Sequence, residues 1–298
     1  MMNIGVIGNI TKQSLPDAVG TLLQLGEVYG LKYFIHNDLQ NLLARLAGQS
    51  GDQAQFVAAD VLVKESDIVV AFGGDGTILS AARMVGDRQI PILGINLGKL
   101  GFLAESSLEE LENFIADITK NHHTVEERTV LKTMLEHDQT EMFALNEVVV
   151  DKSTSSRVIR ISVYVNDDYL VSYSGDGIIV STPTGSTGYA LAAGAPIMVP
   201  TTNVFVLQPI SAHSLSARTV IVPDSSIIKI VVEHHSEEAR VTADGQQEVV
   251  FNPPKNIYVS KANYKVRLIK RKDRSYYDVL RAKLLWGSDV RLVKGTKE

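Results

Sequence analysis

The sequence predicts an α/β N-terminal domain with a parallel sheet, an all-β, sandwich-like second domain and a C-terminal helix that returns to the first domain. Three observations support this class. Apolar strands alternate with helix-like patterns as far as about Ile118, and short β-branched runs separated by turns fill the chain from Thr124 to about Leu268. Helical spacing then returns from Ser275 to Leu285. The expected domains are residues 1–122, 123–270 and 271–298.

In the first domain, a strand that is apolar throughout, Ile68–Phe72, indicates burial on both faces of a sheet. A turn at its carboxyl end lies at the edge where open α/β sheets bind ligands. The other expected strands are Ile4–Ile7, Lys32–Ile35 and Pro91–Ile95. The expected helices are Leu15–Tyr29, Leu39–Leu46, Thr77–Met84 and Leu108–Ile118.

In the second domain, closely spaced β-branched runs without intervening helices predict a sandwich or folded sheet. Turns rich in Gly, Pro, Asn and Asp separate the runs. The expected strands are Leu131–Leu135, Phe143–Val150, Val158–Val165, Gly177–Val180, Val204–Leu207, Thr219–Val222, Ile227–Val232, Val241–Ala243, Ile257–Val259 and Val266–Ile269.

Composition excludes several classes of protein. The 29 Lys and Arg residues against 34 Asp and Glu give a net charge of -5, which provides no basic field for nucleic acid. The chain has no cysteine, so disulfides, thiolate nucleophiles and Cys-type zinc sites are excluded. The N-terminus lacks the features of a signal peptide, and no apolar run approaches the roughly 20 residues that span a bilayer. We therefore expect a soluble, unprocessed, cytoplasmic protein with neither nucleic-acid nor membrane partners.

The segment Gly73-Gly74-Asp75-Gly76-Thr77 directly follows the buried strand. Glycines leave backbone N–H groups accessible to an anionic ligand, and they also mark ordinary tight turns. A carboxylate repels phosphate, so Asp75 fits this turn if it takes a proton from, or orients, a hydroxyl that attacks phosphorus. Gly94–Phe102 fails the spacing of a P-loop, and Gly5–Asn9 fails that of a dinucleotide fingerprint.

A second loop, Ser181–Tyr189, spaces hydroxyls around Gly185 and Gly188 after another apolar strand. Small donors of this kind suit a diphosphate or a base, and Gly185 is expected to let backbone approach a ligand. The pair Asn146-Glu147 is either a strand bulge or a ribose-binding pair. Asp176 and Asp244-Gly245 have the ordinary interpretation of hairpin turns. The seven histidines show no zinc-binding spacing, so we predict no protein-held zinc and name no metal ligand in the chain.

Taken together, these segments resemble the ATP-dependent NAD kinases over nearly the whole chain. The Gly-Gly-Asp-Gly turn alone is shared with diacylglycerol, sphingosine and 6-phosphofructo kinases, whereas Asn146-Glu147 and Thr182–Tyr189 indicate the NAD branch. The segments that carry the resemblance are Gly73–Thr77, Gly94–Leu103, Leu145–Glu147, Asp176-Gly177, Ser181–Tyr189, His213–Leu215 with Arg218, Asp244–Gln246 and Tyr276–Trp286.

The resemblance implies transfer of the γ-phosphoryl group of ATP to the 2′-hydroxyl of the adenosine ribose of NAD, with magnesium carried by the triphosphate. Asp75 matches the proton acceptor, and the turn around it, Gly73, Gly74, Gly76 and Thr77, matches the nucleotide contacts. Asn146 and Glu147 match the pair that holds the ribose or adenine end. Further NAD contacts are implied at Asp176, Thr184, Thr187, Gly188, Tyr189, Ala190, Leu191 and Ala192, and at the more variable positions Arg157, Ser174 and Gln246. The resemblance also implies a homodimer or homotetramer.

Two alternatives remain open from the residues alone. The first is a lipid or sugar kinase that uses the same turn; a lipid kinase predicts an apolar acceptor groove, whereas an NAD kinase predicts walls lined by hydroxyls and amides. A nucleotide sensor without catalysis predicts binding without turnover.

Overall fold

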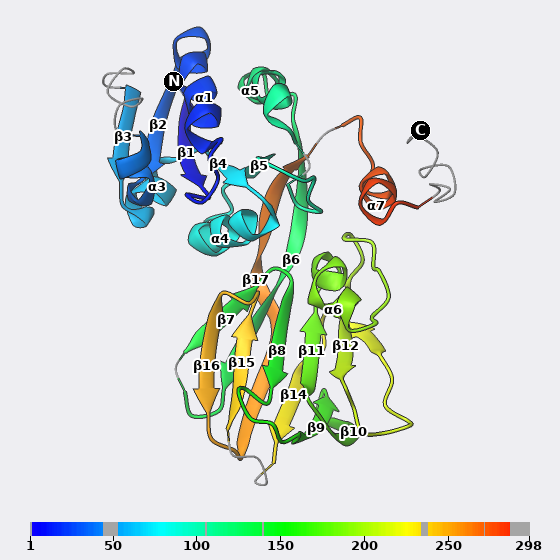
Figure 1. Cartoon of the computed structure of the whole chain (residues 1–298). Helices are drawn as coiled ribbons and strands as arrows, with labels where there is room; N and C mark the ends of the chain where they lie inside the picture. Colours follow the sequence, from blue (N-terminus) through cyan, green and yellow to red (C-terminus); the bar gives the residue numbers. More distant parts are fainter. Residues whose placement is uncertain are drawn as a thin grey trace, which may run out of the picture. The chain divides into compact units, whose positions relative to one another are not determined.

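A computed structural model describes residues 2–43, 53–104, 106–138, 140–233, 238–270 and 272–286 (Figure 1). The chain forms two compact units, Met1–Glu126 with Arg267–Glu298, and Glu127–Val266. The unit boundaries therefore fall inside two strands, β6 (Thr124–Leu135) and β17 (Lys255–Lys270).

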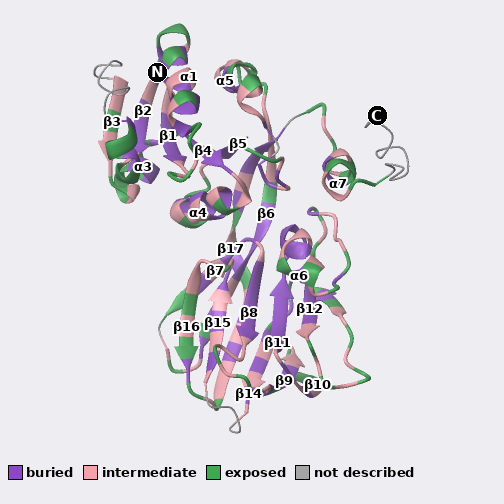
Figure 2. Cartoon of the chain, viewed as in Figure 1, coloured by how far each residue is buried: buried purple, intermediate pink, exposed green. Residues whose placement is uncertain are grey.

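The first unit is built on a parallel sheet in the order β17-β5-β4-β1-β2-β3. Its central strand β4 is buried at every position, as its apolar sequence predicts (Figure 2). The strands are β1 (Met2–Gly8), β2 (Leu31–His36), β3 (Ala54–Val57), β4 (Ile68–Gly73), β5 (Ile92–Asn96) and the end of β17. The helices are α1 (Leu15–Tyr29), α3 (Ala59–Glu65), α4 (Asp75–Val85), α5 (Leu111–Thr119) and α7 (Tyr276–Leu284).

Helices cover both faces of this sheet. On one face α1 packs with α5 over the apolar core that includes Ile4, Val70 and Phe72. On the other face two strand glycines make room for helices. A Cβ on Gly5 would come within 2.7 Å of Leu62 of α3, and a Cβ on Gly94 within 2.3 Å of Ile78 of α4. The arrangement confirms the predicted α/β class.

The second unit consists of two antiparallel sheets that share one apolar core, which confirms the predicted β-rich domain. One sheet has the order β13-β12-β11-β8-β15-β16, and the other contains β10-β9-β14-β17 with β6 and β7. The remaining strands are β7 (Glu141–Ala144), β8 (Glu147–Asp151), β9 (Ile159–Val165), β10 (Asp168–Gly175), β11 (Gly177–Ser181), β12 (Val204–Ile210), β13 (Val220–Pro223), β14 (Ile228–Val232), β15 (Ala239–Ala243) and β16 (Gln247–Phe251). The short helix α6 (Tyr189–Ala192) follows β11.

Several predicted elements differ from the structure. The sequence analysis missed β3, α3, β10 and β16, and it divided the single strand β17 into two. The expected run Phe143–Val150 is two strands, because the chain turns at Leu145 and Asn146 between β7 and β8. Part of the predicted helix Leu39–Leu46 lies outside the described residues.

The C-terminal helix α7 belongs to the first unit, as predicted. Its first turn is fixed by a capping box, in which Ser275 and Asp278 exchange hydrogen bonds. The Lys283 ammonium lies 5.4 Å from the centre of the Phe102 ring, within cation–π range. Among the helices of the described residues, none combines the length and apolar character needed to cross a membrane.

Candidate functional site

The Asp75 carboxylate is held by the loop that follows β5. Its Oδ2 accepts the Phe102 N–H at 2.9 Å, and its Oδ1 accepts the N–H groups of Leu103 and Ala104 at 3.0 and 3.1 Å. Asp75 is also the first residue of α4, so it lies at the positive end of that helix dipole. The carboxylate is therefore fixed in one orientation by three backbone donors.

Close approach between this loop and Asp75 requires a glycine. A Cβ on Gly101 would come within 2.0 Å of the Asp75 Oδ1 atom. The loop itself is tied to β5 by Asn96, whose side chain accepts the Gly98 N–H at 2.7 Å and donates to the Ala104 carbonyl at 3.4 Å. Asn96 and Gly101 thus position the donors that orient Asp75.

The four glycine and threonine neighbours of Asp75 have different environments. A Cβ on Gly73 would lie 2.1 Å from the Thr77 hydroxyl, so Gly73 is needed for packing within the turn. Around Gly74 and Gly76, a Cβ would meet no atom within 4 Å. Open space beside Gly74 and Gly76, at the start of α4, is what an anionic ligand at a helix N-terminus needs.

In the second unit, the turn between β7 and β8 is held by Asp244. Its Oδ2 accepts the Leu145 N–H at 2.8 Å, and its Oδ1 accepts those of Asn146 and Glu147 at 2.7 and 3.2 Å. The Asp244 N–H in turn donates to the Glu147 carbonyl at 3.0 Å. Asn146 and Glu147 are thus placed by an acidic residue nearly a hundred positions away in the sequence.

Glu147 is a buried acid with a perturbed pKa. The residue is only 8% exposed, and its Oε2 atom has no hydrogen-bond partner among the described residues. Burial, reinforced by the negative charge of Asp244, raises the pKa of Glu147 to about 8, while the Tyr189 backbone N–H opposes this rise. A carboxyl group of this kind is typical of a binding or catalytic site.

The loop after β11 lies against the same turn. The Thr182 hydroxyl donates to the Leu145 carbonyl at 2.6 Å and accepts the Gly185 N–H at 3.1 Å, and the Thr182 N–H donates to the Asn146 carbonyl at 2.9 Å. A Cβ on Gly188 would come within 2.9 Å of the Glu147 Oε2. The two segments that indicated the NAD branch are therefore one local assembly.

The expected role of Gly185 was wrong. A Cβ at this position would come within 2.1 Å of the Asn146 carbonyl oxygen and 2.4 Å of its carbon. Gly185 is buried against protein backbone, so its missing side chain serves internal packing and not the approach of a ligand.

Of the remaining residues predicted in this loop, some are buried and others are exposed. Thr184 and Ala190 are buried, and the Thr187 hydroxyl donates to the Thr184 carbonyl at 3.2 Å. Tyr189 is 46% exposed at the start of α6 and can contact a ligand, as can the partly or fully exposed Leu191 and Ala192 on the same helix. Gln246 lies in the turn after Asp244, where its N–H donates to the Ala243 carbonyl at 3.0 Å.

Asp176 lies away from this assembly within the second unit. In the pairing of β11 with β8, Gly177 is opposite Asp151 and Ser181 is opposite Glu147, so Asp176 is at the other end of β11. There it forms an ion pair with Lys152 at 2.8 Å. Hydrogen bonds from Lys152 and Ser211 lower the pKa of Asp176.

Ser174 and Arg157 belong to the Asp176 end of the unit. The Ser174 carbonyl accepts the His213 N–H at 2.7 Å, and His213 acts electrostatically on Asp176. Arg157 is exposed, and its N–H donates to the Ser155 hydroxyl at 3.1 Å. The structure does not bring Arg157, Ser174 and Asp176 to the end of β11 where Glu147 lies.

Sequence reasoning missed three functional positions: Asn96, Gly101 and Asp244. Asn96 and Gly101 lie in the Gly94–Leu103 segment, which failed the spacing of a P-loop and carried part of the family resemblance, but neither residue was given a role of its own. Asp244-Gly245 was interpreted as a hairpin turn, and Asp244 does have the left-handed φ of 53° that such a turn uses. No local signal indicates its bonds to residues 145–147.

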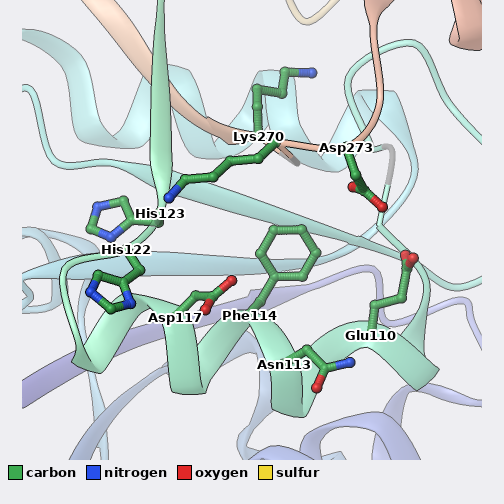
Figure 3. A pocket seen from close by; sticks show the side chains of 9 residues that line it. Glu110, Asn113, Phe114, Asp117, His122, His123, Lys270 and Asp273 are labelled. Atoms are coloured by element: carbon green, nitrogen blue, oxygen red, sulfur yellow. The ribbon is translucent and has the colours of Figure 1, made fainter.

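A separate pocket of about 330 Å³ lies in the first unit beside α5 (Figure 3). It contains none of the residues predicted from the sequence. Its lining mixes carboxylates, lysines and histidines, so it has no single charge preference. The lining residues are Glu110, Asn113, Phe114, Asp117, His122, His123, Lys270, Lys272 and Asp273. Within the part of the chain that the structure describes, no group of three His, Asp or Glu side chains is arranged to hold a metal ion.

Comparison with known proteins identifies the family. Residues 17–123 match the model of the ATP-NAD kinase N-terminal domain, and residues 145–271 match that of the ATP-NAD kinase C-terminal domain. An NAD kinase of Bacteroides fragilis is 37% identical over 297 residues, covering 98% of this chain and 100% of the relative. An NAD kinase of Sulfurimonas denitrificans is 37% identical, covering 94% and 97%.

Two solved structures have the same fold. A yeast NADH kinase complexed with NADH has a TM-score of 0.89 and 22% identity, covering 98% of this chain and 89% of that one. An NAD kinase from Archaeoglobus fulgidus in complex with ATP has a TM-score of 0.75 and 24% identity, covering 94% and 99%. With both family models and near full-length relatives in agreement, the chain belongs to the ATP-NAD kinase family.

Proposed function

We propose that this protein is an NAD kinase that transfers the γ-phosphoryl group of ATP to the 2′-hydroxyl of the adenosine ribose of NAD, giving NADP and ADP. The observation that carries the proposal is the Asp75 carboxylate, oriented by three N–H groups beside two glycines with open space around them. The relatives that span nearly the whole chain bear the same name, NAD kinase.

Asp75 acts as the proton acceptor for the attacking hydroxyl. A carboxylate offers about four lone-pair sites, so three N–H bonds orient the group and leave capacity for one hydroxyl proton. Phosphoryl transfer depends mostly on positioning and charge neutralisation, so a fixed acceptor is more useful than a strong base. Gly73, Gly74, Gly76 and Thr77 form the turn for the phosphates of ATP.

NAD is bound by the assembly around Glu147. Asn146 and Glu147 hold the adenosine end, and the segment from Thr184 to Ala192 supplies further contacts, with Gln246 nearby. Magnesium enters on the triphosphate of ATP and neutralises charge on the phosphates. We propose the cytoplasm as the compartment, in keeping with a chain that has no cysteine.

The position of Asp176 supports a homo-oligomer. Asp176, Ser174 and Arg157 lie at the opposite end of the β8–β11 pair from Glu147, so their contribution to NAD binding fits a site completed by another copy of the chain. We propose a homodimer or homotetramer, which sedimentation equilibrium tests directly: a monomer at assay concentration would contradict it.

The activity is tested by incubating the full chain with ATP, magnesium and NAD and measuring NADP with a dehydrogenase that accepts NADP alone. We expect NADP in a one-to-one ratio with ADP. Parallel reactions replace NAD with diacylglycerol, sphingosine or fructose 6-phosphate. Phosphorylation of one of these in place of NAD would favour a lipid or sugar kinase, and NAD binding without any product would favour a sensor.

A further inference from the structure

Two carboxyl groups of the second unit lie close together but have opposite environments. Asp244 accepts three backbone N–H bonds, at 2.7 to 3.2 Å. Glu147 has an Oε2 atom that is buried and has no partner among the described residues. Hydrogen bonds from N–H donors favour an ionised carboxyl, whereas burial without donors favours a protonated one.

The charged and polar groups around Glu147 come from three elements. The turn after β15 contributes Asp244, which is the charged group that acts on Glu147. The start of α6 contributes the Tyr189 backbone N–H, and its Gly188 neighbour approaches the Glu147 Oε2 with no side chain between them. The paired strand β11 contributes Ser181, whose hydroxyl donates to the carbonyl of Thr182 at 2.9 Å. No cation among the described residues is placed to stabilise an ionised Glu147.

We propose that Asp244 is a positioning residue that fixes the Asn146-Glu147 turn and whose charge adds to the burial of Glu147 in keeping that carboxyl protonated, so that Glu147 donates a hydrogen bond to an acceptor atom of the bound nucleotide. The identification of that nucleotide as NAD rests on the proposed function. The protonation of Glu147 and its dependence on Asp244 are independent of the proposed function.

The chemistry distinguishes two ways of recognising the ligand. An ionised Glu147 only accepts hydrogen bonds, and would bind an amino or hydroxyl donor. A protonated Glu147 carries one O–H donor, and binds a ring nitrogen or a ribose oxygen. Where two titratable groups have environments that separate their pKa values, one stays ionised and the other stays protonated. Asp244, with its three donors, is the ionised member of this pair.

A pH dependence follows from this assignment. Below pH 8 Glu147 holds its proton and can donate to the ligand. Above pH 8 it ionises, and each further pH unit lowers the fraction of donor about tenfold. The KM for NAD therefore rises with pH above 8. The pKa read from this pH profile is that of the Glu147 carboxyl.

The experiment is a pH titration of the full chain labelled with [5-¹³C]glutamate and followed by carboxyl ¹³C NMR. The Glu147 signal is assigned by its loss in Glu147→Gln. The test variant is Asp244→Asn, because asparagine keeps the shape and tolerates the left-handed φ of 53° but carries no charge. The control is Asp224→Asn, which removes another buried acid of the same unit, one paired with Lys261 at 2.6 Å.

We expect the wild-type Glu147 signal to titrate near pH 8. Asp244→Asn should lower that midpoint, while the burial of Glu147 keeps it above the 4.5 of an unperturbed glutamate. The control variant should leave the midpoint unchanged even if it lowers stability. In the NADP-forming assay, Asp244→Asn should raise the KM for NAD about tenfold, as expected for a displaced hydrogen-bonding pair, with a smaller change in kcat. A wild-type midpoint near 4.5, or an unchanged midpoint in Asp244→Asn, would overturn the proposal.

A second variant keeps the inference testable if Asp244→Asn does not fold. Glutamine at position 147 is neutral at every pH and keeps an N–H donor, so Glu147→Gln should bind NAD equally well at pH 7 and pH 9.5, where the wild type weakens. Equal weakening of both proteins would overturn the proposal. Absence of NADP formation by the wild type would contradict the proposed function, while the NMR titration would still measure the Glu147 carboxyl.

Discussion

At the scale of single residues, two aspartates have the same hydrogen-bond pattern but different roles. Asp75 and Asp244 each accept three backbone N–H bonds from a neighbouring loop. Asp75 is the acid of the Gly-Gly-Asp-Gly turn, where the proposed reaction needs a proton acceptor. Asp244 holds the turn that carries Glu147. The same three-donor arrangement thus orients a carboxylate in one unit and a binding turn in the other.

Glu147 makes the stability of the folded protein depend on pH. Its pKa of about 8 in the folded state is above the 4.5 of an unperturbed glutamate, so the folded state binds more protons between these values. The stabilisation from the neutral form is full below about pH 4.5 and is lost as pH rises through 8. We therefore predict that Glu147→Gln becomes more stable relative to wild type as pH rises from 5 to 9.

Urea unfolding at pH 5, 7 and 9 measures this change. The matched control is Glu112→Gln, which neutralises an exposed carboxyl on α5. The stability difference between Glu147→Gln and wild type should grow with pH, and the control difference should stay nearly constant. If the Glu147→Gln difference were also flat, Glu147 would not carry a raised pKa.

The sequence predicted some of these residues and not others, for a physical reason. Asp75 and Glu147 stand out locally, because each is a polar residue next to an apolar strand. Asp244 has only a local signal for a turn, while its partners lie 97 to 99 residues away. Gly185 looked like room for a ligand, because sequence does not reveal that the Asn146 backbone fills the space.

At the scale of elements, the loop between β11 and α6 is a packed structure and not an open phosphate loop. Gly185 lies against the Asn146 carbonyl, and Thr182 bonds to both neighbouring carbonyls of the β7–β8 turn. The loop therefore binds the carbonyl groups of the Leu145–Asn146 turn, while Asp244 binds the N–H groups of residues 145–147.

Gly185→Ala tests this packing. The added Cβ would overlap the Asn146 backbone at 2.1 Å, so we predict a loss of about 1–3 kcal/mol in the free energy of unfolding. NAD affinity should fall with it, because the binding turn must move. The control is Gly98→Ala in the first unit, where the nearest atom to the new Cβ is 3.6 Å away. Normal stability of Gly185→Ala in urea unfolding would contradict this account.

The elements that the sequence missed share weak patterns. Strand β10 begins with three exposed residues, and β16 alternates exposed and intermediate positions at the edge of its sheet. Strand β17 has two apolar runs joined by a mostly polar stretch, so the prediction left a gap at Ser260–Lys265 although the strand continues. Strongly apolar elements such as β4 and β11 were predicted because burial on both faces leaves a clear signal.

At the scale of the whole molecule, the fold class and the family follow from the same residues. The alternation of strands and helices, followed by β-branched runs, predicted the two kinds of unit that the structure contains. The domain limits were expected at 122/123 and 270/271, and the structure divides at 126/127 and 266/267, inside β6 and β17. Strands that run through a boundary give no break in the sequence pattern, so such limits cannot be read from it.

The central claim is that Asp75 meets the hydroxyl that receives the phosphate. Its most direct test measures kcat and the NAD dissociation constant for Asp75→Asn beside the wild type. We predict that kcat falls by roughly 10²- to 10⁴-fold, as on removal of a general base, while NAD affinity stays within about tenfold. A kcat equal to that of the wild type would contradict the role of Asp75 and with it the proposed mechanism.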